Sequence, residues 1–187
     1  MATESNPFPL LAKILHGGIA IFGITAFLSG ELAEDGMQTT GYYIHAYLGL
    51  SLALFIAVRI YRGFTAAAPL RFSGWSPFSI RQWSLSMQDV RDLLHLHVPE
   101  RGIHEGLAGL TQAFGLILFS WMAFSGAGLF LLASKPETQL FEVIEELHEV
   151  GESLIPLYLA FHVGSVVVHS VAGKPIWQRM WRLKPGS

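Results

Sequence analysis

Four long apolar segments restrict what this chain can fold into. They cover residues 10–28, 42–62, 107–133 and 151–172. A helix needs about 20 apolar residues to cross the hydrocarbon core of a bilayer, and these segments are close to that length. Only 14% of all residues are charged, against about 25% in an average soluble domain. The pattern predicts four transmembrane helices.

We therefore predict an all-α fold, a membrane four-helix bundle in which residues 1–187 form a single membrane domain. The connection at residues 63–106 is the only one large enough for extramembrane structure. Residues 1–28 lack the cationic start and the small-residue cleavage site of a signal peptide. We expect them to supply the first span.

Charged residues are divided unequally between the two sides of the predicted bundle. The connection at 134–153 carries six glutamates and a single cation, Lys135, and the connection at 29–41 carries three acidic residues and no cation. The other eleven of the twelve Lys and Arg residues lie on, or nearest to, the opposite side. Cationic loops stay in the cytoplasm, so both termini and the 63–106 loop are predicted to be cytoplasmic.

The chain contains no cysteine. This excludes disulfides, thiolate-bound iron–sulfur clusters and covalent haem attachment through a C-x-x-C-H motif. Any haem would have to be b-type, held by ligation and packing alone.

Four histidines lie within or at the mouth of the predicted spans: His16, His45, His148 and His162. Ionisable residues inside a membrane are costly and are candidates for function. His148 and His162 are fourteen residues apart, which in a helix is a rise of about 21 Å and nearly four full turns. Both side chains would therefore leave one helix on nearly the same face, one near each side of the bilayer.

The predicted topology pairs these histidines by depth. His45 and His148 fall in the outer half, whereas His16 and His162 fall in the inner half. Neutral imidazole is a good ligand for haem iron, and two imidazoles give a six-coordinate centre suited to electron transfer. The four histidines are therefore the candidate metal and cofactor ligands for two haems, and no catalytic residue is assigned.

The histidine pattern by itself is also compatible with roles that involve no haem. A single histidine in an apolar helix is more often a hydrogen-bonded core residue than a ligand. A haem-free membrane anchor, or a proton-coupled carrier subunit that uses the histidines as relays, is the alternative function. Within the haem hypothesis, His169 lies seven residues after His162 and competes with it for the inner site.

The 63–106 connection contains a second amphipathic pattern. Residues 84–97 could form a helix capped by Ser84 or Ser86, with a loose apolar face that includes Leu85, Val90 and Leu93. Such a helix could lie on the membrane surface. An ordinary loop helix would have the same pattern.

The chain resembles the bacterial cytochrome b561 and hydrogenase-type b-cytochromes over nearly its whole length. The resemblance is carried by the four candidate ligands, by Gly49, by the span exit at Arg59–Phe64, and by an ending in which His169 and the stretch Trp177–Trp181 follow His162. It implies a four-helix bundle with two b haems that spans the bacterial inner membrane. It also implies electron exchange between a quinone pool and a partner redox protein of a respiratory chain.

The expected function is thus that of a membrane-bound di-haem b-type cytochrome. The expected cofactors are two haem b groups per chain, with quinone as a possible substrate. Besides membrane lipid, a periplasmic c-type cytochrome or another oxidoreductase subunit is the expected partner, and no nucleic acid. The acidic outer face could attract a basic partner through long-range electrostatics, although a merely solvated face would carry the same charges.

Overall fold

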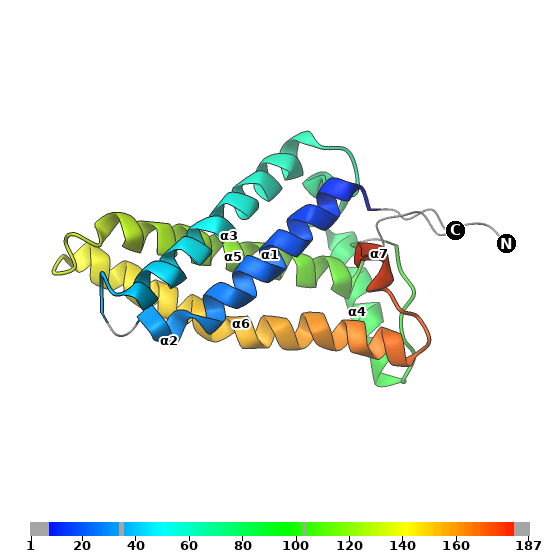
Figure 1. The fold of residues 1–187 in the computed structure, drawn as a ribbon. Coiled ribbons are helices and arrows are strands. Elements are labelled where there is room, and N and C mark those ends of the chain that lie inside the picture. Colours follow the sequence, from blue (N-terminus) through cyan, green and yellow to red (C-terminus); the bar gives the residue numbers. More distant parts are fainter. Residues whose placement is uncertain (1–7, 34–35, 103, 182–187) are drawn as a thin grey trace. The chain divides into compact units, whose positions relative to one another are not determined.

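The computed structural model describes residues 8–33, 36–102 and 104–181 (Figure 1). Within these residues the chain is helical and has no strand, as predicted. The elements are α1 (Leu10–Leu28), α2 (Gly30–Ala33), α3 (Thr40–Thr65), a short 3₁₀ turn η1 (Phe72–Gly74), α4 (Ile80–Leu94), α5 (Leu107–Leu132), α6 (Gln139–Val171) and α7 (Gln178–Trp181).

Four of these helices are long and apolar enough to cross a membrane: α1, α3, α5 and α6. This confirms the predicted four-helix membrane fold. Three of them begin and end within three residues of the predicted spans. The exception is α6, a 33-residue helix that begins twelve residues before the predicted span, because the acidic segment at its start continues into the span without a break.

The contacts group the chain into two compact units, each of which takes part of all four long helices. Unit 1 contains the chain up to Ile14, then Tyr61–Gly115, and the chain from Tyr158 onward. Unit 2 contains Leu15–Ile60 and Leu116–Leu157.

Small residues and rings bring the helices of unit 2 together. The ring of Phe55 on α3 lies directly against Gly18 of α1, where any side chain would overlap it. The same ring contacts Phe22, with centroids 5.5 Å apart. Such close packing of helices against small residues is typical of membrane proteins, where hydrophobic burial alone gives no drive to associate. Ile56 and Leu118 are the most deeply buried side chains of this unit.

In unit 1, α4 is held against the connection that leads into α5. The side chain of Ser79 caps α4 by accepting a hydrogen bond from the Gln82 N–H. The sequence-based prediction of a cap at Ser84 or Ser86 was therefore wrong, and the helix begins four residues earlier than expected. Beyond α6, the Nζ of Lys174 lies 2.6 Å from a carboxylate oxygen of Glu100. The hydrogen bond from Lys174 and the positive charge of its ammonium group lower the pKa of Glu100.

Candidate functional site

Two of the four candidate ligands meet inside unit 2. His45 lies near the start of α3 and His148 near the start of α6, and both side chains are half-buried. Their ring centroids are 6.2 Å apart and the ring planes are nearly perpendicular, at 87°. Residues more than a hundred positions apart in the sequence are thus brought together at one end of the unit.

The His45 ring is held through its Nδ1 atom. This nitrogen lies 3.0 Å from the carbonyl oxygen of Ala26 and 3.4 Å from the hydroxyl oxygen of Ser29. Because a carbonyl oxygen can only accept, Nδ1 must carry the ring proton. The Nε2 atom then has a free lone pair, which is the form of histidine that binds a metal.

The His148 ring is fixed in the same way from α5. Its Nδ1 lies 2.8 Å from the Oγ of Ser125. The Ser125 hydroxyl also lies 2.8 Å from the carbonyl oxygen of Trp121, to which it donates. Both hydrogen bonds form together only if Nδ1 donates to Ser125, so here too Nε2 keeps its lone pair.

Gly126 of α5 leaves the space that the His148 ring occupies. A Cβ atom built on this glycine would lie 3.1 Å from Cε1 of the ring, closer than ordinary van der Waals contact. The ring therefore lies close to the α5 backbone. A glycine that sequence analysis treats as a general packing residue thus has a specific neighbour.

The separation of the two rings suits a single metal held between two imidazoles. With bonds of about 2.0 Å, and each ring centroid about 1.1 Å beyond its nitrogen, the centroids would be about 6 Å apart. The observed 6.2 Å fits this arrangement. Among the described residues no group of three or more His, Cys, Asp or Glu could hold a metal. A porphyrin would supply the remaining ligands of a six-coordinate iron.

The other two candidate ligands belong to different units. His16 lies on α1 in unit 2, whereas His162 lies on α6 in unit 1. The His162 ring is stacked on Tyr158 one turn earlier, with centroids 5.5 Å apart and planes at 15°. Tyr158 in turn contacts Phe114, at 5.9 Å. Aromatic packing thus helps to position the His162 ring.

His169, the competitor of His162, is held through the same ring atom as His45. Its Nδ1 lies 2.8 Å from the carbonyl oxygen of Ser165 on the preceding turn of α6. His104 lies outside the spans in unit 1, where its ring contacts those of Phe8 and Trp75.

The residues that orient the rings were not predicted from the sequence. Ser29 and Ser125 are buried polar residues, and the Ala26 acceptor is a backbone atom with no signature in the sequence. Ser125 carried only a weak signal, because hydroxyl groups inside transmembrane helices can hydrogen-bond to a neighbouring helix.

An all-helical, multi-pass membrane protein with paired intramembrane histidines is the class that this fold and site define. The family model of prokaryotic cytochrome b561 matches residues 7–183. The chain therefore belongs to the prokaryotic cytochrome b561 family. No curated protein and no solved structure matches it.

Membership of this family confirms the expected type of function. The chain is a membrane b-type cytochrome that binds b-type haem and transfers electrons. Family membership also favours an electron-transfer function over that of a haem-free anchor or carrier.

Proposed function

We propose that this protein holds two haem b groups, one in each half of the bacterial inner membrane, and transfers electrons between two redox partners. His45 and His148 are the ligands of the outer haem, and His16 and His162 are those of the inner haem. One electron partner is the quinone pool, and the other is a redox protein on the periplasmic side. When bound, the haems supply one-electron redox chemistry with little structural rearrangement.

The observation that carries this proposal is the His45–His148 pair. The two rings lie 6.2 Å apart and each is held through Nδ1, so each Nε2 atom keeps its lone pair for a metal. The acceptors at Ala26 and Ser125 restrain the orientation and the tautomer of each ring. Such second-shell hydrogen bonds commonly fix the histidines that bind metals.

The inner pair is supported by the sequence and by α6. His148 and His162 lie on this one continuous helix, where fourteen residues correspond to a rise of about 21 Å. His16 near the start of α1 is expected at the depth of His162. The pairing of His16 with His162 depends on this argument from depth, since the two residues belong to different units.

The number of haems is the first test. Pyridine haemochrome analysis of the purified protein should give about two b-type haems per chain, and a reduced-minus-oxidised spectrum should show a b-type α-band. One haem per chain would reject the two-site proposal. No haem at all would restore the anchor or carrier alternative.

The hydrogen bond from His148 to Ser125 should tune the outer haem. An acceptor at Nδ1 makes the imidazole a stronger donor to iron and favours the oxidised state, so Ser125→Ala should raise the reduction potential. A hydrogen bond contributes about 0.5–1.5 kcal/mol, and about 59 mV corresponds to a tenfold change for one electron. We expect a rise on the order of 20–60 mV in a potentiometric titration.

Ser153→Ala is the matched control for this measurement. The Ser153 hydroxyl donates to the Val150 carbonyl of its own helix, so its loss should leave both potentials unchanged. An unchanged potential in Ser125→Ala would show that this hydrogen bond does not act on a haem.

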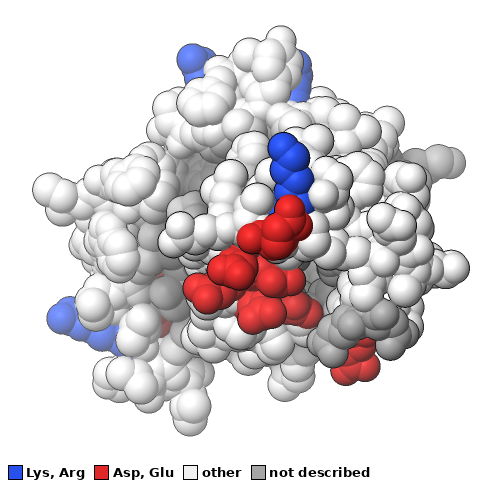
Figure 2. Space-filling view, turned by 90° about the vertical axis from the view of Figure 1, so that its left-hand side faces the viewer, with Lys and Arg blue, Asp and Glu red and all other residues white. Residues whose placement is uncertain are grey.

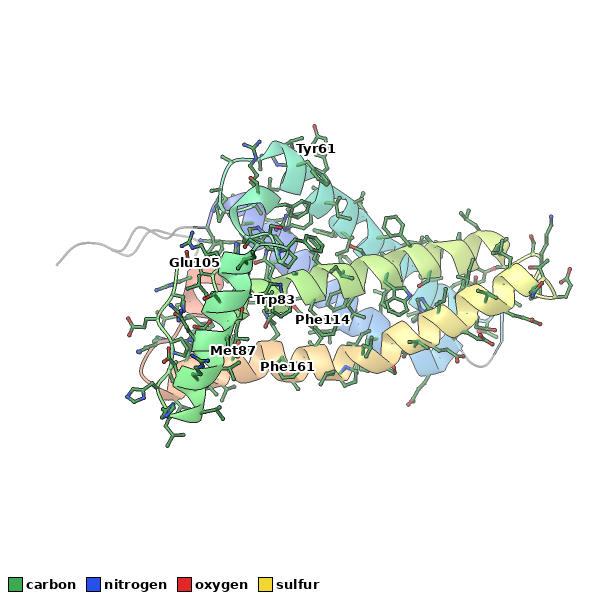
Figure 3. All side chains as sticks on the ribbon, turned by 180° about the vertical axis from the view of Figure 1, so that it is seen from behind. Tyr61, Trp83, Met87, Glu105, Phe114 and Phe161 are labelled. Carbon is green, nitrogen blue, oxygen red and sulfur yellow. The ribbon has the colours of Figure 1, made fainter. Side chains whose placement is uncertain are left out.

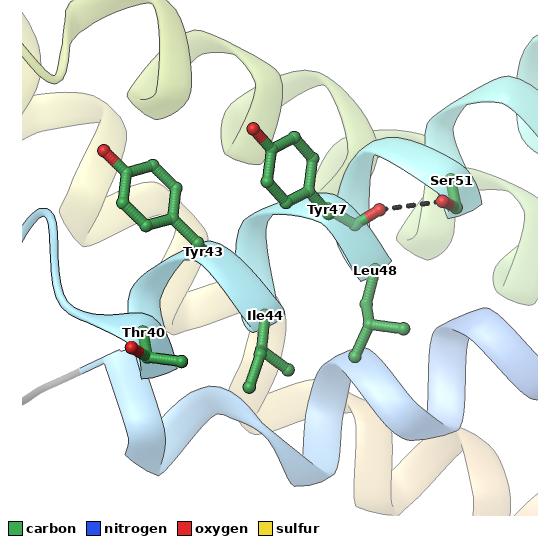
Figure 4. Close-up of a pocket in the computed structure, with 6 residues that line it drawn as sticks. All are labelled: Thr40, Tyr43, Ile44, Tyr47, Leu48 and Ser51. Carbon is green, nitrogen blue, oxygen red and sulfur yellow. Dashed lines mark hydrogen bonds between the residues drawn. The ribbon is translucent and has the colours of Figure 1, made fainter.

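A shallow groove on α3 supports the quinone part of the proposal. Its volume is about 470 Å³, and it is lined by Thr40, Tyr43, Ile44, Tyr47, Leu48 and Ser51 (Figure 4). The rings of Tyr43 and Tyr47 are stacked, with centroids 6.2 Å apart. Phenol hydroxyls can donate to quinone carbonyls, and aromatic faces suit a planar ring. His45 lies in the same turns of α3.

The acidic start of α6 supports a basic partner. Figure 2 shows a cluster of acidic side chains on this face of the molecule. The exposed glutamates of this segment are Glu137, Glu142, Glu145, Glu146 and Glu149. Because His148 lies among them in the sequence, a basic c-type cytochrome attracted to this surface would be brought to the outer haem.

Electron transfer in right-side-out inner-membrane vesicles tests both partners and the proposed topology. With quinol as donor, a basic c-type cytochrome added outside should be reduced, and the rate should fall as ionic strength rises. Tyr47→Ala should raise the quinol concentration that gives the half-maximal rate by severalfold. The double variant Glu145→Gln/Glu146→Gln should weaken only the dependence of the reduction rate on ionic strength.

Each part of this experiment has its own contradicting result. No reduction from outside would reject the proposed topology or this class of partner. A normal quinol dependence in Tyr47→Ala would exclude the α3 groove. If the rate kept its dependence on ionic strength without the two glutamates, the acidic face would not be the binding surface for the partner.

A further inference from the structure

Helix α4 in unit 1 has its polar side inside. Gln82, Ser86 and Asp89 are spaced four and three residues apart, so they lie along one side of the helix. Their exposed fractions are 5%, 4% and 3%. A helix that covers a protein surface normally buries its apolar side instead.

The buried polar row is occupied by hydrogen bonds to the connection before α5. The Gln82 amide donates to the carbonyl oxygens of His104, at 3.1 Å, and Gly106, at 3.0 Å. One carboxylate oxygen of Asp89 accepts from the Arg101 guanidinium, at 2.5 Å, and the other from the Leu107 N–H, at 2.8 Å. These bonds determine which side of α4 faces the protein.

The apolar residues of α4 therefore remain uncovered. Ile80, Trp83, Met87 and Leu94 follow one another at intervals of three, four and seven, so they form a second row along the helix. Their exposed fractions are 88%, 59%, 55% and 77%. Single exposed apolar residues are ordinary, but a continuous row marks an interaction surface.

The position of α4 indicates what covers this apolar row. Leu107, whose N–H is bound by Asp89, is the first residue of the transmembrane helix α5. α4 is therefore tied to the point where α5 enters the membrane. In Figure 3, Trp83 and Met87 project from α4 on the side where Phe114 and Phe161 of the membrane-spanning helices lie.

We infer that α4 lies in the membrane interface, with Ile80, Trp83, Met87 and Leu94 inserted between the lipids of the leaflet next to the α3–α5 connection. Lipid would surround the adjoining spans, and α4 is tied to the first residue of one of them. Trp83 is a residue type enriched at this depth. The exposed Arg91, next to the row, suits the phosphate headgroups. The inference depends on the transmembrane helices and not on the proposed haem ligands.

The absence of cysteine allows a direct test. Met87→Cys and Gln88→Cys each introduce a single thiol for a spin label, at neighbouring exposed positions about 100° apart around α4. The labelled full-length protein is reconstituted into phospholipid vesicles. Electron paramagnetic resonance then compares collisions of each label with oxygen, which concentrates in hydrocarbon, and with a water-soluble nickel chelate.

We expect the ratio of oxygen to nickel collisions to be several times higher at position 87 than at position 88. Position 87 should lie about 5–10 Å below the headgroups. An unchanged haem spectrum and circular dichroism spectrum would show that both variants are folded.

Three results would overturn the inference. Equal ratios dominated by the nickel reagent would place the row in water. Few collisions with either reagent at position 87 would mean that protein or a cofactor covers the row. Dipolar broadening between position-87 labels would identify that cover as a second copy of the chain.

Discussion

Replacing His148 by alanine should lower the haem content of the purified protein from about two groups per chain to about one. The variant removes one of the two imidazoles that meet in unit 2, and the described residues around the pair offer no third metal-binding group to replace it. Pyridine haemochrome analysis gives the stoichiometry. A potentiometric titration should show that one of the two redox transitions is lost while the other keeps its potential.

His169→Ala is the matched control for this loss. This residue is a histidine on the same helix that the proposal does not assign as a ligand, so the variant should keep both haems. If His148→Ala retained two haems, the proposed outer pair would be wrong. If His169→Ala lost one and His162→Ala did not, His169 would be the inner ligand.

Replacing Asp89 by alanine should reduce the stability of the protein by about 3 kcal/mol or more. The carboxylate has only 4% of its side chain exposed and pairs with Arg101, and it also accepts from the Leu107 N–H. Removing it leaves a half-buried guanidinium and a helix N-terminus without their partner, and unpaired buried groups are expensive. The measurement is thermal unfolding in detergent, followed by circular dichroism.

Asp92→Ala is the control for this prediction. Its carboxylate lies 3.9 Å from the same Arg101, but its side chain is 49% exposed, and exposed ion pairs contribute only about 0–1 kcal/mol. The Asp89 variant should therefore melt well below the Asp92 variant. Equal melting temperatures would show that the buried carboxylate does not stabilise the start of α5.

Much of the fold could be predicted because it depends on hydropathy along each segment. Residues 10–28 form α1 with the same bounds, and the other spans were found within a few residues at most of their ends. The apolar span within α6 begins later than the helix itself, because glutamates between Gln139 and Gly151 lower the apolar character without interrupting the helix. Hydropathy indicates where a helix can be in lipid, but it does not indicate where the helix begins.

The candidate site was only partly predictable. His45 and His148 could be paired because the charge asymmetry orients the spans and orientation assigns a depth to each residue. The acceptors at Ala26 and Ser125 could not be predicted. One is a backbone atom and the other is a common residue, and their role depends on which helices are neighbours.

Helix α4 shows most clearly the difference between what the sequence pattern reveals and what the tertiary structure reveals. The sequence alone shows an amphipathic segment in the 63–106 connection, but its pattern does not reveal which side faces the protein. The tertiary structure decided this, because Arg101, His104 and Gly106 supply the hydrogen-bond partners that bury the polar row.

The sequence by itself determined four membrane-spanning helices, and its charges and spacings predict their topology and histidines at two depths. These properties depend on the composition and order of residues along single segments. Only the tertiary structure decided that His45 and His148 meet at 6.2 Å, which atoms restrain their rings, and which side of α4 remains uncovered. These features depend on contacts between distant segments, and the chain order does not encode such contacts locally.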